Sequence, residues 1–210
     1  MGIQVRLPGI VTEPEIEDLG TEAFTRTHQK MKALAEDVHH GHSEGKILLV
    51  EHPPVHTAGR ATPQEELREG VVPIERGGRT TFHGPGQLVI YPILRLPKRD
   101  VHAWLRTLEN YTIAICAEFG LTGEASVDGT GVFVDTKKVA SIGVAIRHWI
   151  NLHGVAINVD MDLAGFFEIS PCGLEPTTMT DLSRAAGRPI TMNSAKQAAR
   201  LHSPILSTGH

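Results

Sequence analysis

The stretch that decides the fold is GVFVDTKKVASIGVAIRHWINLHGVAINVDM, residues 131 to 161. It holds three runs rich in β-forming residues, GVFVD (131–135), KVASIGVAIRHW (138–149) and NLHGVAINVDM (151–161), which follow one another with short connections. Short connections join antiparallel strands, whereas parallel strands need a crossover of a dozen or more residues. The stretch therefore predicts an antiparallel meander.

The rest of the chain alternates between strand and helix patterns. IQVRL (3–7), ILLVEH (47–52), VVPIE (71–75) and QLVIYPILRL (87–96) are strand candidates. Helices are expected over residues 21–38, 100–119, 180–187 and 191–201, where apolar residues recur at helical spacing or Asp and Thr caps open a polar run. We expect one α/β domain over residues 1–210, of the α+β type, with a mixed, largely antiparallel sheet flanked by helices.

Composition excludes several classes of protein. The 210 residues are 40% hydrophobic and 21% charged, which is typical of a globular chain. No stretch approaches the ~20 apolar residues of a membrane span. Twenty basic against 24 acidic side chains leave no overall positive field for nucleic acid. Two cysteines are few for an oxidising compartment, so a cytoplasmic location is expected, with no membrane or nucleic-acid partner.

The two cysteines have different surroundings. Cys172 lies in SPCGLEP, where the neighbouring Pro171 and Gly173 predict a turn that leaves the thiol accessible. Cys116 lies in the long helix among apolar residues, which is typical of an inert buried thiol. Cys172 is therefore the candidate nucleophile.

A nucleophilic cysteine needs a cation or a base beside it, because a thiol with a pKa near ~8.5 is only slightly ionised at pH 7. Lys138 opens the strand KVASIGV and is one candidate, although Lys137 and Lys138 also fit a solvated hairpin turn. His83 in HGPG and His153 in HGVAIN are the others, since Cys and His form the commoner dyad. The residues alone leave this choice open.

A metal site is a weaker alternative. Five histidines crowd a short stretch, but HPPVH cannot form a helical pair because of its prolines, and no cysteine ligand lies near. A phosphate-binding loop of the GKS or GKT kind is absent from the sequence. We therefore expect neither a metal nor a cofactor. The histidines are His39, His40, His42, His52 and His56.

RGGRTTFHGPGQLVIYPIL (76–94) resembles the RGG-x-x-T-x-HGPGQ signature of the lipoate-biosynthesis octanoyltransferases, the lipoyl(octanoyl) transferase or LipB family. The family's other blocks are matched in order by LLVEHPPVHTAGR (48–60), TGVFVDTKKVASIGVAIRHW (130–149), LHGVAINV (152–159) and PCGL (171–174). The resemblance runs from about residue 16 to 190. It implies the fold of the lipoate and biotin protein ligases.

The resemblance also implies a Cys-Lys dyad. Cys172 matches the family's acyl-thioester nucleophile, and Lys138 matches the lysine that lowers its pKa, so that His83 and His153 become residues that form the pocket. The residues that the resemblance assigns to acyl-chain binding are Arg76, Gly77, Gly78, Arg79, Thr80, Thr81, Phe82, His83, Ser141, Ile142, Gly143, Gly154, Val155 and Ala156.

The activity implied is that of an octanoyl-[acyl carrier protein]:protein N-octanoyltransferase. Octanoyl would pass from octanoyl-acyl carrier protein through a Cys172 thioester to the acceptor lysine of a lipoyl domain, in a 2-oxoacid dehydrogenase or the glycine-cleavage H protein, without ATP. Backbone N–H groups of Gly77, Gly78, Ser141 and Ile142 are expected to meet the oxyanion.

Two positions depart from the family pattern, and two other functions compete. Position 79, often acidic or an amide in the family, is Arg79. The tail after residue 190 does not resemble the family's usual closing helix, and after about residue 200 it is expected to be loosely ordered. An ATP-dependent lipoate ligase on the same fold and a non-catalytic acyl-binding module are the alternatives. Ligases do not use a PCGL thiol, so Cys172 argues against the first.

Overall fold

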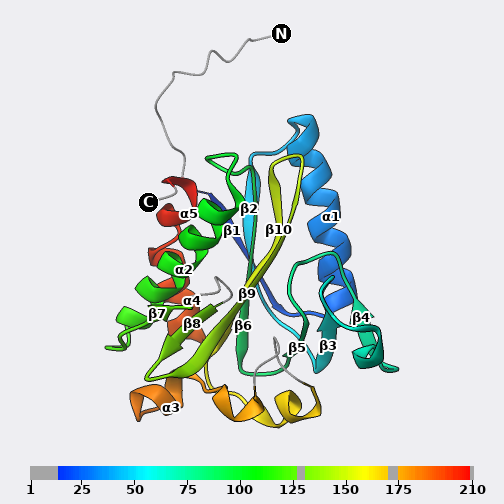
Figure 1. Cartoon of the computed structure of the whole chain (residues 1–210). Coiled ribbons are helices and arrows are strands. Elements are labelled where there is room, and N and C mark those ends of the chain that lie inside the picture. The colour runs from blue at the N-terminus through cyan, green and yellow to red at the C-terminus, as the bar shows by residue number, and fades with distance from the viewer. Residues whose placement is uncertain (1–13, 127–130, 170–174, 209–210) are drawn as a thin grey trace.

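The computed structural model describes residues 14–126, 131–169 and 175–208. A seven-stranded sheet runs through the middle of the molecule in the order β1-β2-β6-β10-β9-β8-β7 (Figure 1). Its strands are β1 (Glu15–Thr21), β2 (Gly45–Glu51), β6 (Gln87–Leu94), β7 (Glu124–Ala125), β8 (Gly131–Val134), β9 (Lys137–Arg147) and β10 (Ile150–Asn158).

The meander predicted over residues 131–161 is confirmed. β8 pairs antiparallel with β9, β9 with β10, and β10 in turn with β6, while β1 alongside β2 is the parallel pair of this sheet. The sheet is therefore mixed and largely antiparallel, as expected. The turn between β9 and β10 places His148 and Trp149 at positive φ, the conformation that a tight hairpin of two residues requires.

A second, three-stranded sheet has the order β4-β3-β5. It consists of β3 (Val55–Ala58), β4 (Val71–Pro73) and β5 (Thr80–His83), with the short helix η1 (Gln64–Glu66) between the first two. The sequence patterns predicted only β4 of this sheet. β5 pairs with β3, Gly77 N of the RGG segment donates a hydrogen bond to Val144 O of β9, and the His83 ring of β5 stacks on the Phe24 ring of α1.

Helices cover both faces of the large sheet (Figure 1). α1 (Phe24–His40) packs on β2, β6 and β10, and α2 (Val101–Ala117) lies on the other face against β8, β9 and β10. The Asp100 side chain accepts a hydrogen bond from Ala103 N, which caps α2 at the predicted position. Among the described residues, no helix is long and apolar enough to cross a membrane.

The C-terminal third is helical, as predicted, and its last part is ordered. It contains η2 (Leu163–Glu168), η4 (Pro176–Thr178), α3 (Leu182–Ala186), α4 (Met192–Leu201) and α5 (Pro204–Thr208). The expectation of a loosely ordered tail after about residue 200 is corrected here. Leu206 of α5 is 1% exposed and belongs to the main hydrophobic core, and this burial holds the tail in place. The strand expected at 3–7 lies outside the described residues.

A bulge in β9 decides which way Lys138 points. Val132 pairs with Ala140 but Phe133 pairs with Lys138, so β9 has one extra residue, Val139, at this place. Val139 and Ala140 both lie in the core beneath α2. Because side chains alternate across a strand, the extra residue turns Lys138 to the opposite face, the one that α1 covers.

Candidate active site

Lys138 has the environment of a functional lysine. Its side chain is 1% exposed, and its ammonium has no hydrogen-bond partner among the described residues. Nζ lies 5.8 Å from the centre of the Phe133 ring, and a Cβ on Gly131 would come within 2.6 Å of the Lys138 Cε. Glycine at position 131 therefore leaves the room that the lysine stem occupies. A buried ammonium without a partner is costly, which favours a role in chemistry over one in stability.

Cys172, the predicted nucleophile, lies outside the described residues. The chain that follows it runs beside Lys138. Thr180 N donates a 3.0 Å hydrogen bond to Lys138 O, and Lys137 Nζ donates one of 2.6 Å to Thr177 O. This part of the chain is thus held against the start of β9.

Cys116 is a core residue, as its position in the helix indicates. It is fully buried in α2, and burial raises the pKa of its thiol to about 12. A thiol with so high a pKa is almost never ionised at neutral pH, so Cys116 cannot serve as the nucleophile.

An apolar pocket opens between α1, β6, β9 and β10, and it is called the acyl pocket below after the role that the resemblance implies for its residues. About 420 Å³ in and around it is free of protein atoms, and this figure includes open solvent at its mouth. Its lining combines small residues of β9 and β10 with rings from α1, β5 and β6. The residues are Phe24, Ile74, Arg76, Thr81, His83, Val89, Tyr91, Ser141, Ile142, Gly143, His153, Gly154, Val155 and Ala156.

The structure brings nine of the fourteen residues assigned to acyl binding to this lining. They are Arg76, Thr81, His83, Ser141, Ile142, Gly143, Gly154, Val155 and Ala156. The other five, Gly77, Gly78, Arg79, Thr80 and Phe82, do not line it. Arg79 forms an ion pair with Glu66 instead, and the Phe82 ring packs edge-on against Phe166. Phe24, Ile74, Val89, Tyr91 and His153 complete the lining.

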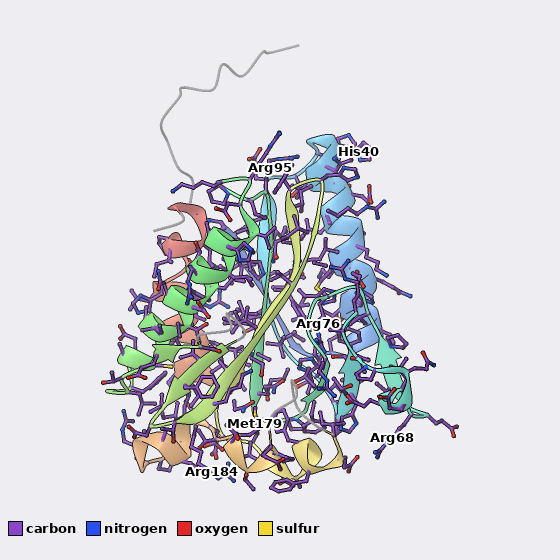
Figure 2. All side chains as sticks on the ribbon, viewed as in Figure 1. His40, Arg68, Arg76, Arg95, Met179 and Arg184 are labelled. Atoms are coloured by element: carbon purple, nitrogen blue, oxygen red, sulfur yellow. The ribbon has the colours of Figure 1, made fainter. Side chains whose placement is uncertain are left out.

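Arg76 joins the small sheet to the large one. Figure 2 shows it in the middle of the molecule, whereas Arg68 lies at the edge. Its guanidinium donates to Gly77 O at 3.0 Å, Arg79 O at 2.8 Å and Thr57 O at 2.8 Å, and its stem covers Gly143, whose added Cβ would meet the Arg76 Cδ at 3.0 Å. Because backbone carbonyls occupy its guanidinium N–H groups, Arg76 has a structural role as part of the pocket wall.

A buried hydrogen-bond network begins at His83. The guanidinium of Arg76 donates to Thr57 Oγ1 at 3.1 Å, and that hydroxyl lies 3.5 Å from Nε2 of His83. On its other side, His83 Nδ1 donates to Gln87 Oε1 at 2.7 Å. This pairing fixes the imidazole with its proton on Nδ1.

The same network continues to the lysine strand. Gln87 Nε2 donates to Asn158 Oδ1 at 2.9 Å, and Asn158 Nδ2 donates to Thr180 O at 2.8 Å. Thr180 N donates in turn to Lys138 O. Sequence reasoning missed Asn158 and gave Gln87 no role of its own, although both end quoted motifs, HGPGQ and GVAIN. The network fixes the segment after Cys172 to the pocket.

His28, Glu75 and His153 form a cluster at one end of the acyl pocket. His28 Nε2 lies 2.9 and 3.0 Å from the two Glu75 oxygens, while His153 Nε2 lies 3.6 Å from the nearer one, too far for a hydrogen bond. His153 has φ 63° in the middle of β10, a conformation that non-glycine residues rarely adopt. The His153 imidazole beside it and the hydrogen bond to His28 hold the pKa of the Glu75 carboxyl well below its usual range, whereas burial lowers that of His153.

The chain matches the lipoyl protein ligase A/B catalytic domain family over residues 26–202. It is 42% identical over 193 residues to the octanoyltransferase of Syntrophotalea carbinolica, covering 90% of this chain and 92% of that protein. It is 43% identical to the octanoyltransferase of Geobacter sulfurreducens, over 88% of this chain and 80% of that one. The chain belongs to the octanoyltransferase family.

Solved structures of other proteins share the fold of this octanoyltransferase-family chain. The bipartite lipoate protein ligase of Thermoplasma acidophilum has a TM-score of 0.69 at 16% identity, over 90% of this chain and 82% of that one. The biotin protein ligase of Aquifex aeolicus with biotin and ATP has a TM-score of 0.59 at 13% identity, over 90% and 68%. At such low identity the likeness shows the fold alone, and this fold is the one that the resemblance implied.

The histidines that suggested a metal do not converge in this octanoyltransferase-family chain. Within the described ranges, the one group of ligand atoms close enough for an ion is His28, Glu75 and His153, all within 4.8 Å of one another. None of the five crowded histidines belongs to it. His28 and Glu75 already form a hydrogen bond with each other.

Acid should destabilise the protein through His83. Burial lowers the pKa of His83 from 6.5 to about 3, so the folded protein keeps it neutral while the unfolded chain takes up a proton below pH 6.5. The free energy of unfolding should therefore decrease as the pH is lowered, and His83 should account for about 1.5 kcal/mol of the decrease between pH 6.5 and pH 5. Urea unfolding at the two pH values measures this difference. His83→Gln should show a smaller one, and an equal difference in both proteins would contradict the assignment.

Proposed function

We propose that this chain transfers octanoyl groups from octanoyl-acyl carrier protein to lipoyl domains through a thioester on Cys172. The observation that carries the proposal is the buried Lys138 ammonium, which has no partner among the described residues and shares a face of β9 with the Ser141 and Gly143 lining of the acyl pocket. A cation in that position supports ionisation of a thiol brought beside it. The relatives named octanoyltransferase support the acyl group.

The first half-reaction loads the enzyme. The Cys172 thiolate attacks the thioester carbonyl of the donor, the carbon–sulfur bond to the carrier breaks, and the phosphopantetheine leaves as a thiolate that takes up a proton. The product is an octanoyl-Cys172 thioester. Lys138 stabilises the thiolate before attack through its positive charge.

The second half-reaction unloads it. Acylation removes the negative charge of the sulfur, so Lys138 loses its ionic partner and passes its proton to the departing phosphopantetheine thiolate. The neutral Lys138 amine then accepts a proton from the acceptor lysine as that lysine attacks the thioester. An amide forms, Cys172 leaves as a thiolate beside the reprotonated Lys138, and no ATP is consumed. The burial of Lys138 favours this proton transfer, because little water competes with the lysine for the proton.

One expected oxyanion donor is corrected by the hydrogen bonds. Gly77 N donates to Val144 O at 2.9 Å, so its N–H is not available to an oxyanion. Ser141 pairs with Gly131 of β8 and Ala156 of β10, and Ile142 pairs with Val155 of β10. In the loading step of this proposal, the Lys138 ammonium stabilises the oxyanion, and it needs no free backbone donor.

The partners in this proposal are an acyl carrier protein as donor and a lipoyl domain as acceptor, on a 2-oxoacid dehydrogenase or the glycine-cleavage H protein. Octanoyltransferases as a class act on these two kinds of protein. A cytoplasmic location also remains a prediction, which rests on the two cysteines of the sequence.

Mass spectrometry of the intact protein tests the proposal. After incubation with octanoyl-acyl carrier protein, the wild type should carry one octanoyl group that hydroxylamine removes, because hydroxylamine cleaves thioesters. Cys172→Ser should not become labelled in this way, and Cys116→Ser should be labelled like the wild type. An unmodified wild type under these conditions would refute the thioester.

An ATP-dependent lipoate ligase is the second candidate, because the solved structures that share the fold are ligases. It predicts ATP-stimulated attachment of free lipoate to a lipoyl domain, with Cys172→Ser as active as the wild type. The same two proteins separate this outcome from acyl transfer. They also separate both from an acyl-binding module, which would bind octanoate without transferring it.

A further inference from the structure

Two cavities lie end to end beneath α1. Beyond the acyl pocket is a second one of about 440 Å³, called the distal groove below. Phe24 of α1 lines the acyl pocket, Lys32 lines the groove, and His28 lies between them at steps of four residues on one helix face. The groove is lined by Lys32, Ala35, Glu36, Arg60, Glu75, Ala145, Ile146, Arg147 and Leu152.

The strands repeat this order. Along β9, Ser141 and Gly143 line the acyl pocket, and Ala145 lines the groove. Along β10, Gly154 lines the pocket and Leu152 the groove. Lys138 precedes Ser141 on the same strand face, so the lysine, the acyl pocket and the groove follow one another along the sheet.

The cluster of His28, Glu75 and His153 stands where the two cavities meet. His153 faces the acyl pocket and Glu75 faces the groove, with 3.6 Å between the imidazole and the carboxylate. The strained backbone at His153 turns its ring onto the face that already carries Leu152, where it lies tilted against the His28 ring at 5.4 Å between centres. His153 lines the acyl pocket, with His28 and Glu75 behind it, and these three side chains are called the end wall below.

We infer that this wall sets the length of acyl chain that the enzyme accepts, an inference that rests on the proposed function. Gly143 lies five positions after Lys138 on β9, which spans at most roughly 16 Å at ~3.3 Å per residue. The lysine side chain and the thioester take up the first part of this length, and the remainder is of the order of an extended eight-carbon chain. A longer chain would have to displace the His153 ring and desolvate the hydrogen-bonded His28 and Glu75 behind it.

The variant His153→Gly removes the wall without straining the fold. Glycine adopts a φ of 63° freely, so the backbone of β10 keeps its course while the imidazole is lost. Chains of 12 carbons should then reach the groove, where Ala145 and Leu152 offer apolar surface. Since each buried methylene contributes about fourfold, the ratio of kcat/KM for dodecanoyl over octanoyl carrier protein should rise by about tenfold or more.

Refilling the groove provides the matched control. Ala145→Leu places a larger side chain in the groove, beyond the wall, so alone it should leave the wild-type preference for octanoyl unchanged. In the double variant His153→Gly with Ala145→Leu, the preference should return toward that of the wild type. This reversal would not follow if His153→Gly acted only by loosening the protein.

Two results would overturn the inference. One is a wild type that uses octanoyl and dodecanoyl donors equally. The other is a folded His153→Gly protein, judged by circular dichroism and thermal unfolding, whose chain-length ratio equals that of the wild type. A failure of the proposed function looks different, because then the wild type transfers no acyl group. In that case thermal shifts with free octanoic and dodecanoic acids still test the wall, and they should favour the longer acid only in His153→Gly.

Discussion

Replacing Lys138 with methionine is expected to lower the rate of octanoyl transfer severely while leaving the protein at least as stable as the wild type. Methionine fills a similar volume, and it removes an ammonium that is 1% exposed and without a hydrogen-bond partner among the described residues. Removing an unpaired buried charge should raise the free energy of unfolding by about 1 kcal/mol or more. Loss of the group that ionises the thiol and accepts the amine proton should lower kcat/KM by about 10³-fold.

Lys137→Met is the matched control for this experiment. Lys137 is the exposed neighbour, whose Nζ bonds to Thr177 O, so its loss should change neither activity nor stability much. Urea unfolding and acyl transfer measured on both variants give the comparison. A Lys138→Met protein that is destabilised by several kcal/mol would show that the ammonium serves the fold, and the proposed role would then fail.

Replacing Arg76 with methionine should cost the largest share of stability of any single change at the site. Four hydrogen bonds from one buried guanidinium are lost, and the carbonyls of Thr57, Gly77 and Arg79 lose a donor. Each bond to a charged donor contributes about 1.5 kcal/mol or more, so the unfolding free energy should fall by about 3 kcal/mol or more. Equilibrium urea unfolding measures it.

Arg76→Lys separates charge from shape in the same assay. Lysine keeps the charge but lacks the planar fork, so it should recover less than half of the lost stability. Arg68→Met, a change at the molecular edge, is the control and should be nearly neutral (Figure 2). If Arg76 only contacted the acyl chain, Arg76→Met would instead be as stable as the wild type and impaired in acyl transfer alone.

Much of the fold could be predicted from the sequence because local signals and tertiary packing agree there. The apolar alternation of β9 and β10, the Asp100 cap of α2 and the Gly187 cap of α3 each specify an element without help from elsewhere. β1 was missed because EIEDLGT is acidic and lies at the sheet edge, where little apolar pattern is needed. β5 was missed because its Thr-rich strand lies within a glycine-rich segment and depends on pairing with β3.

The candidate site, like the fold, could be predicted from the sequence only in part. Lys138 could be named from its motif, but its orientation could not, because the bulge depends on how β8 pairs with β9. The cluster of His28, Glu75 and His153 joins residues 47 or more positions apart and includes a backbone angle that no pattern signals. Long-range pairing of this kind is fixed by the packed structure rather than by local sequence. The assignment of Cys172 remains a prediction.

The bulge in β9 makes the site sensitive to the phase of two neighbouring strands. One added residue between Val132 and Phe133 would bring β8 and β9 back into step, and Lys138 would then point beneath α2, away from any acyl chain. Deleting Val139 would also restore the step, yet it would leave the ammonium on its present side. The insertion in β8 and the deletion in β9 should thus have opposite effects on the direction in which Lys138 points, although neither alters a residue of the acyl pocket.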